Sequence, residues 1–416
     1  MEINLDDVAL RNAECRTLSN GVKIYTLSSN EFEVLRVSFV FGAGSVVQSR
    51  PFAATATANL LSEGSETMTA REIAEKLDYY GSYFDVNVDR DHSYFSFCSL
   101  SKFVEPTLDV AEQILLHPTF PKEEIRTYCT KRKQRLRIER EKVETKAREE
   151  FAKSMFGENH PYGTSSHEDA YDTLSREDIL DIYNRFYIAQ NCFVVCSGRV
   201  GEVEMARIEA LASKIRVGAE LNKVEFPEPQ QRPFHLVEQP EAVQSSIRIG
   251  RRLFTRTHPD FLGMQLLATT LGGYFGSRLM QSLREERGYT YGVMSTMVNF
   301  AEDGYLAIAT QVGVEVTREA IDLIHKELDR LRVELIPEEE LEMVCRIMIG
   351  EIMRILDGPF GVADVTIENI LCGQDNSSIE DNVRRICEFT PADIQALAQK
   401  YLDPEEMICV VSGRME

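Results

Sequence analysis

The chain has 416 residues, of which 43% are hydrophobic and 27% charged, a composition typical of a soluble globular protein with more than one core. Its net charge of −21 disfavours nucleic acid and acidic membranes as partners and favours basic peptides. No apolar run reaches the roughly 20 residues that cross a bilayer, and residues 1–15 lack the apolar core of a signal peptide. These features predict a cytoplasmic protein, or a periplasmic one if a leader has been removed.

The first half of the chain places strands before helices. Alternating apolar and polar residues indicate antiparallel strands, and small apolar residues ending at Gly64 indicate a short helix in the stretch ATATANLLSEGSE. The predicted elements are strands at 21–29 and 33–44, a hairpin at 83–100, and helices at 54–66, 104–116 and 122–156.

The second half follows the same pattern after a polar, proline-rich stretch at 220–233 that reads as a linker. A glycine-rich stretch, LGGYFGSR at 271–278, is interpreted as a flexible turn at a helix end. The predicted elements are strands at 245–253, 289–300 and 304–312, and helices at 277–288, 317–334 and 338–356.

An internal repeat connects the two halves. DILDIYNRFYIAQNCFVVCSGR at 178–199 aligns without gaps on DIQALAQKYLDPEEMICVVSGR at 393–414, at an offset of 215 residues. Both copies begin with a capping-box pattern, Ser175-x-x-Asp178 and Thr390-x-x-Asp393. The repeat predicts an α+β fold of two tandem homologous domains, 1–219 and 234–416, each an antiparallel-rich sheet with helices packed on one face.

Spacing alone reveals no complete catalytic constellation. None of the seven histidines pair four residues apart on a helix, so neither the zinc motif HExxH nor its inversion HxxEH is present. A Walker A loop and a GxSxG elbow are missing as well. Nine cysteines lie scattered without a CxxC pair, which favours reduced, buried thiols.

One segment, SRLMQSLREERGYTYGVMS at 277–295, carries a candidate pair of functional residues. Arg284 lies near the end of the predicted helix, and Tyr291 follows seven residues later in the predicted strand. The guanidinium and the phenol both suit a peptide carbonyl or a developing oxyanion. The alternative is an arginine that complements the helix C-terminus and a half-buried strand tyrosine.

This segment resembles the motif S-R-L-x-x-x-L-R-x-x-x-G-x-x-Y of the pitrilysin-type zinc metallopeptidases, the family of insulin-degrading enzyme and the mitochondrial processing peptidase. Here the motif runs from Ser277 through Arg284 and Gly288 to Tyr291. The resemblance covers essentially the whole chain. It implies that Arg284 and Tyr291 contact substrate near the scissile bond.

The resemblance also locates a degenerate zinc site. In the family an HxxEH helix precedes a Gly-Ser pair and a segment such as SAREIAE, and this chain keeps Gly64-Ser65 and the segment 69–75. Counting back from Gly64 puts Thr55 and Asn59 at the histidine positions and Ala58 at the glutamate position. None of the three can bind zinc as imidazole or carboxylate, or serve as the general base.

A third family ligand, a glutamate on the following long helix, falls near 134–141, where Glu139 or Glu141 could occupy it. His160, in FGENHPYGTSS, belongs to a structural part of the family pattern and is not a ligand. One carboxylate alone cannot hold zinc.

The resemblance is closest to the family's zinc-less, non-catalytic subunits. It implies a homologue that is not active alone, has no cofactor of its own, binds a peptide between acidic walls, and completes the site of a zinc-bearing partner subunit. Two alternatives remain open at this point. The chain is a structural or peptide-binding homodimer, or it is a stand-alone zinc peptidase with ligands outside the expected helix.

Overall fold

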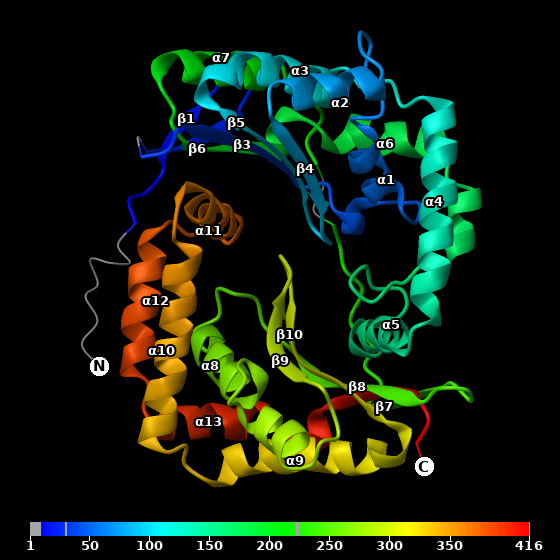
Figure 1. Cartoon of the computed structure of the whole chain (residues 1–416), viewed down its shortest axis with the longest axis vertical. Coiled ribbons are helices and arrows are strands. Elements are labelled where there is room, and N and C mark those ends of the chain that lie inside the picture. Colours follow the sequence, from blue (N-terminus) through cyan, green and yellow to red (C-terminus); the bar gives the residue numbers. More distant parts are fainter. Residues whose placement is uncertain (1–9, 30, 222–223, 416) are drawn as a thin grey trace.

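The computed structural model describes residues 10–29, 31–221 and 224–415, and contains two sheets flanked by helices (Figure 1). The strands of the first half are β1 (Glu14–Thr17), β2 (Lys23–Ser28), β3 (Val34–Phe41), β4 (Tyr83–Val88), β5 (Ser93–Leu100) and β6 (Cys192–Gly198). Its helices are α1 (Ala53–Leu60), α2 (Ala70–Tyr79), α3 (Val104–Leu116), α4 (Lys122–Glu141), α5 (Val143–Phe156), α6 (Arg176–Phe186) and α7 (Glu202–Ser213), with a 3₁₀ turn η4 (Glu168–Asp172).

The second half repeats this order of elements. Its strands are β7 (Phe234–Glu238), β8 (Gln244–Leu253), β9 (Val293–Asn299), β10 (Gly304–Gly313) and β11 (Ile408–Gly413). Its helices are α8 (Phe261–Gly272), the π-helical segment η6 (Met280–Glu285), α9 (Thr317–Val333), α10 (Glu338–Ile355), α11 (Pro359–Leu371), α12 (Ser377–Glu388) and α13 (Pro391–Tyr401).

The two sheets share one strand order, apart from the additional edge strand β1 of the first sheet. The strand order is β1-β2-β6-β3-β5-β4 in the first and β7-β11-β8-β10-β9 in the second. In each sheet the last strand of the half lies between two early strands: β6 lies between β2 and β3, and β11 lies between β7 and β8. Strand β6 runs parallel to β2 and β11 runs parallel to β7, while the other described pairings are antiparallel. The α+β fold with two antiparallel-rich sheets is therefore confirmed.

The predicted capping boxes are present at both copies of the repeat. Asp178 N donates to Ser175 Oγ at 3.2 Å, and Ser175 N donates to the Asp178 carboxylate at 2.9 Å. Thr390 and Asp393 make the same reciprocal pair at 3.3 and 2.9 Å. Each box satisfies two backbone N–H groups that the first turn of a helix leaves without a partner.

The helix expected over 122–156 is two helices. Lys142 has extended dihedral angles (φ −76°, ψ 132°), which end α4 and start α5 in a new direction. The change of direction lets α5 leave its own half: Phe151 and Met155 of α5 pack with Ala307 and Ile408 of the second sheet. The break therefore serves a contact that is distant in the sequence.

A reciprocal contact is made by α11. Its residues Ala363 and Ile367 pack with Val40 and Val195 of the first sheet. Helices α5 and α11 occupy equivalent places in the repeat, since they begin 216 residues apart, at 143 and 359. Each half therefore packs its own helices on one face of its sheet and receives a helix of the other half on the second face (Figure 1).

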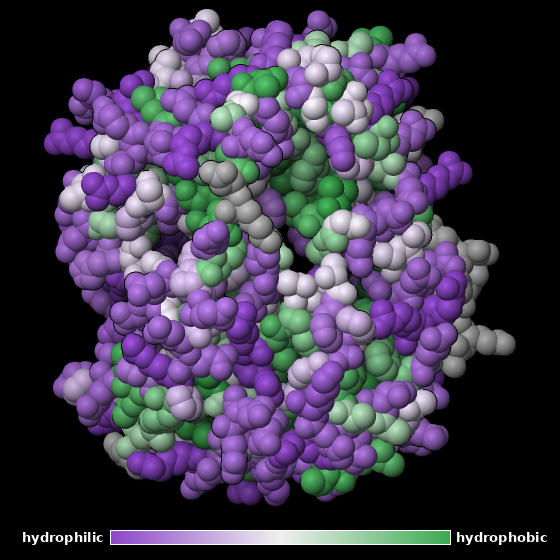
Figure 2. Space-filling view, turned by 180° about the vertical axis from the view of Figure 1, so that it is seen from behind, coloured by the Kyte–Doolittle hydropathy of each residue, from purple (hydrophilic) through white to green (hydrophobic). Residues whose placement is uncertain are grey.

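The two main cores lie under the helices of each half. Figure 2 shows that the surface is hollowed at the level where the halves meet, with hydrophobic residues around the openings. All nine cysteines are free thiols, and Cys192, Cys196, Cys345 and Cys409 are buried. Within the described part of the chain, no helix is long and apolar enough to span a membrane.

Candidate functional site

Helix α1 carries Thr55, Ala58 and Asn59, the positions that the family resemblance aligns with the zinc ligands and general base. Thr55 and Asn59 lie one turn apart on its partly exposed side, and Asn59 Nδ2 donates to the Thr55 carbonyl at 2.7 Å. Ala58 is fully buried in the first core. The methyl group of Ala58 is packed in the core at the position that the resemblance gives to a general base. With Thr55 and Asn59 at the other two positions, the three residues offer neither imidazole nor carboxylate.

Arg132 of α4 reaches the same point. Its guanidinium donates to Asn59 Oδ1 at 3.0 Å, and the guanidinium carbon lies 5.2 Å from the centroid of the Tyr128 ring, a cation–π contact. The interpretation that Glu139 or Glu141 would face α1 receives no support from these contacts, because Glu139 accepts from Arg135 Nε at 2.8 Å and lies seven residues, about 10 Å of helix, beyond Arg132. A cation, not a carboxylate, extends from α4 to α1.

Zinc does not fit these residues. A zinc site needs imidazole, thiolate or carboxylate ligands, and a guanidinium beside the ligand positions repels a divalent cation. Across the described ranges 10–29, 31–221 and 224–415, no group of three or more His, Cys, Asp or Glu side chains is placed to hold a metal ion. We therefore derive no reaction step through a metal bound to α1.

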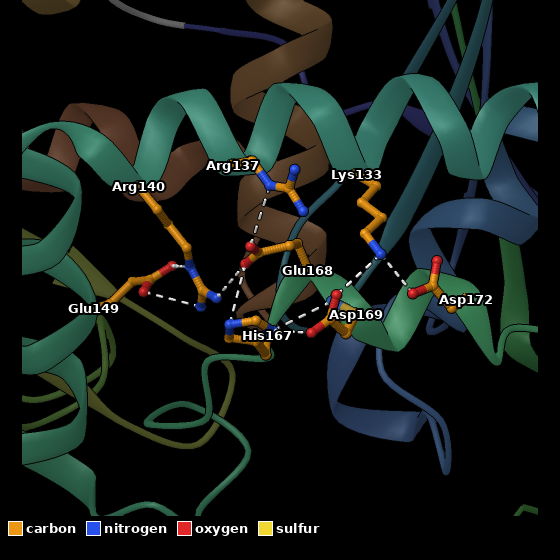
Figure 3. A network of polar contacts seen from close by, with 8 residues as sticks. All are labelled: Lys133, Arg137, Arg140, Glu149, His167, Glu168, Asp169 and Asp172. Atoms are coloured by element: carbon orange, nitrogen blue, oxygen red, sulfur yellow. Dashed lines mark hydrogen bonds and ion pairs between the residues drawn. The ribbon is translucent and has the colours of Figure 1, made fainter.

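A polar network fixes α4 in this orientation (Figure 3). Lys133 Nζ lies 2.9 Å from the carboxylate of Asp169, which lowers the pKa of that exposed carboxyl, and the Arg140 guanidinium lies 3.0 Å from Glu149 and 3.3 Å from Glu168. The network joins α4 to α5 and to η4. The residues drawn are Lys133, Arg137, Arg140, Glu149, His167, Glu168, Asp169 and Asp172.

Arg284 and Tyr291 lie side by side, while their contact with substrate stays a prediction. Segment η6 ends in a π-type hydrogen bond from Glu286 N to the Gln281 carbonyl at 2.9 Å, and Gly288 N closes the turn on the Arg284 carbonyl at 3.0 Å. Gly288 adopts φ +66°, a conformation that favours glycine, and the chain returns so that Tyr291 lies 5.1 Å from the Arg284 guanidinium carbon.

The surroundings of Arg284 and Tyr291 differ from the alternative of a helix-end arginine beside a half-buried strand tyrosine. Tyr291 is 90% exposed and precedes β9, so it is not a half-buried strand residue. Phe275, from the glycine-rich stretch, lies 4.8 Å from the Arg284 guanidinium carbon and is 61% exposed. The sequence interpretation missed Phe275; an aromatic residue inside a glycine-rich turn was the available signal.

The first half contributes a second feature, the free edge of β4. This strand ends its sheet, and Tyr83, Asp85 and Asn87 of β4 are exposed. Helix α1 packs beside β4 (Figure 1). The degenerate zinc positions therefore adjoin an open sheet edge, whereas Arg284 and Tyr291 belong to the other half.

Comparisons with known proteins agree with the fold. A model for Insulinase (Peptidase family M16) matches residues 26–166, and a model for Peptidase M16 inactive domain matches residues 173–348. A zinc protease of Bacillus subtilis, itself uncharacterized, is 20% identical over 410 residues, covering 95% of this chain and 97% of its own.

Two solved structures superpose along nearly the whole chain. A peptidase M16 inactive domain from Pseudomonas fluorescens has a TM-score of 0.88 at 23% identity and covers 98% of both chains. A protease from Helicobacter pylori has a TM-score of 0.87 at 15% identity and covers 97% of this chain and all of its own. At such low identity the likeness to both structures shows the shared fold.

Proposed function

The chain belongs to the insulinase-type M16 peptidase family, and we propose that it is a catalytically incomplete member that binds peptide and completes the site of a zinc-bearing homologous partner. The observation that carries the proposal is the asymmetry between its two motifs. Thr55, Ala58 and Asn59, at the positions that the family resemblance gives to the zinc ligands and general base, supply neither imidazole nor carboxylate. Arg284 lies beside Tyr291, its side chain is 30% exposed with Nε 3.5 Å from Glu285, and Tyr291 is 90% exposed.

The role proposed for this chain is to hold a peptide in an extended pose. The free edge of β4 can pair with an extended backbone, as in other cases of strand addition. Arg284 supplies planar, in-plane N–H donors for peptide carbonyls, and Tyr291 supplies a phenolic O–H. The partner would supply the zinc. The net charge of −21 favours peptides that carry Lys or Arg.

The proposal is tested by purifying the tagged chain from its native cells and identifying what associates with it. We expect a homologous chain of similar length that contains HxxEH. The complex should cleave internally quenched peptides, and Arg284→Ala should lower kcat/KM by about tenfold or more, the loss expected for a charge-assisted contact to the reacting peptide.

Arg346→Ala is the matched control, because Arg346 is an exposed arginine of α10 that pairs with Glu342 at 3.0 Å. Equal cleavage by the Arg284→Ala and Arg346→Ala complexes would contradict the proposal that this chain completes the partner's site. Recovery of self-associated chain alone would instead favour a structural or peptide-binding homodimer. One equivalent of zinc in the purified chain would favour a stand-alone peptidase.

A further inference from the structure

The glycine-rich stretch begins with two glycines, Gly272 and Gly273, at which a side chain would meet neighbouring backbone atoms. A Cβ on Gly272 would come within 2.6 Å of Ser295 N on β9, whereas one on Gly273 would come within 2.6 Å of Thr269 Cα in the last turn of α8 itself. Neither neighbour can move away, because both are main-chain atoms of regular elements. Gly272 is therefore packed closely against β9, and the turn that follows it leads from α8 to η6.

Phe275 follows Gly272 by three residues and lies beside Arg284. The Arg284 guanidinium carbon lies 4.8 Å from the Phe275 ring centroid and 5.1 Å from that of Tyr291. Contacts of a guanidinium with ring faces leave its N–H groups directed outward in their own plane. The two rings thus restrict the orientation of a side chain that would otherwise have many rotamers.

Both rings remain largely uncovered. Phe275 is 61% exposed and Tyr291 is 90% exposed, and Met294, on β9 beside the glycine-rich stretch, is 55% exposed. Aromatic residues and arginine are the residue types that dominate binding energy at interfaces. An exposed apolar surface around an oriented arginine is suited to a ligand that carries both a carbonyl and a large apolar group.

We propose that Phe275 is a positioning residue for Arg284, and that Phe275, Tyr291 and Met294 select a large apolar side chain next to the peptide carbonyl that Arg284 binds. This inference rests on the proposed peptide-binding function and specifies its substrate class. Basic residues elsewhere in the peptide are compatible with it, because the apolar preference concerns a single position.

The chain contains no tryptophan, so Phe275→Trp introduces a single fluorescent reporter at the proposed site. Phe234→Trp on β7, where Phe234 is 54% exposed, is the matched control. The probes are two acetylated decapeptides of serine and lysine, identical except for a central phenylalanine or alanine. We expect the phenylalanine peptide to change the emission of the Phe275→Trp chain and to leave that of the Phe234→Trp chain unchanged.

Fluorescence anisotropy of the labelled peptides then compares the wild-type chain with three variants. We expect Arg284→Ala and Phe275→Leu each to weaken binding of the phenylalanine peptide about tenfold, and Phe275→Tyr to restore it. The wild-type chain should bind the alanine peptide about tenfold more weakly than the phenylalanine peptide. Because Phe275 is mostly exposed, its variants should unfold at the wild-type temperature.

The outcomes separate this inference from the function on which it rests. Loss of binding in Arg284→Ala but not in Phe275→Leu would overturn the positioning role and leave the proposed function intact. Equal affinity for the two peptides would overturn the apolar selectivity. No binding by the wild-type chain would overturn both, and a dimer that dissociates in Phe275→Leu would assign the surface to a second copy instead.

Discussion

At the scale of single residues, the hydrogen bond between Arg132 and Asn59 predicts that histidines at positions 55 and 59 alone do not give α1 a zinc site. The Arg132 guanidinium lies 3.0 Å from Asn59 Oδ1, so its positive charge would be next to any metal bound by a side chain at position 59. We predict that Thr55→His/Asn59→His does not bind zinc, whereas adding Arg132→Glu supplies a third ligand, removes the positive charge and tightens binding by at least about tenfold.

Isothermal titration with zinc, together with metal analysis of the dialysed chains, measures this effect. The control is Thr55→His/Asn59→His/Arg346→Glu, which makes the same charge change on α10 far along the chain. Equal zinc affinity in the double variant and in the triple variant with Arg132→Glu would show that Arg132 does not oppose the metal.

His160 provides a second prediction at this scale. It is 3% exposed, accepts from Tyr162 N at 3.1 Å through Nδ1, and stacks between Phe156 and Phe226. Burial lowers the pKa of His160, so the unfolded chain binds a proton there more readily than the folded chain. The stability that neutral His160 contributes is present above its unfolded pKa and is lost as the pH falls through about 6.5.

We therefore expect His160→Gln to be less stable than the wild type, by a margin that narrows between about pH 7.5 and about pH 5.5. Urea unfolding at several pH values measures the difference in the free energy of unfolding between the wild type and His160→Gln. The other six histidines are present in both proteins, so their contributions cancel in this difference. A margin that stays constant or widens toward acid pH would contradict the assignment of His160 as a buried neutral residue.

At the scale of elements, the repeated capping boxes predict equal effects at distant sites. Ser175→Ala and Thr390→Ala each remove the side chain that accepts from the N3 backbone, and should each lower the free energy of unfolding by about 1 kcal/mol. Thr130→Ala is the contrasting control: Thr130 lies inside α4 and donates to the Arg126 carbonyl, so alanine should be neutral or slightly stabilising there. Chemical denaturation measures whether each substitution lowers or raises the free energy of unfolding.

Elements were predictable where their causes are local. The strand alternation, the capping boxes and the turn at Gly288 all depend on nearby residues. The break at Lys142 and the approach of Phe275 to Arg284 depend instead on contacts with the second sheet and with β9. Periodicity along one helix carries no information about such partners.

At the scale of the whole molecule, the exchange of α5 and α11 ties the halves together. Each helix covers the second face of the sheet that belongs to the other half, so neither half alone buries its apolar surface. Further links are polar: the Arg36 guanidinium pairs with Asp364 of α11 and lies 5.1 Å from the Phe360 ring. The repeat predicts two similar domains, but the exchange makes each depend on the other for a complete core.

This dependence predicts that the chain unfolds as one cooperative unit. Phe151→Ala removes a side chain that is 2% exposed and lies in α5 against the second sheet, and should cost about 3–5 kcal/mol. Because the loss weakens both halves, differential scanning calorimetry should show a single transition at a lower temperature, whereas Phe234→Ala, at a half-exposed site, should shift it little. Two separate transitions, with only one moved by Phe151→Ala, would show that the halves fold independently despite the exchanged helices.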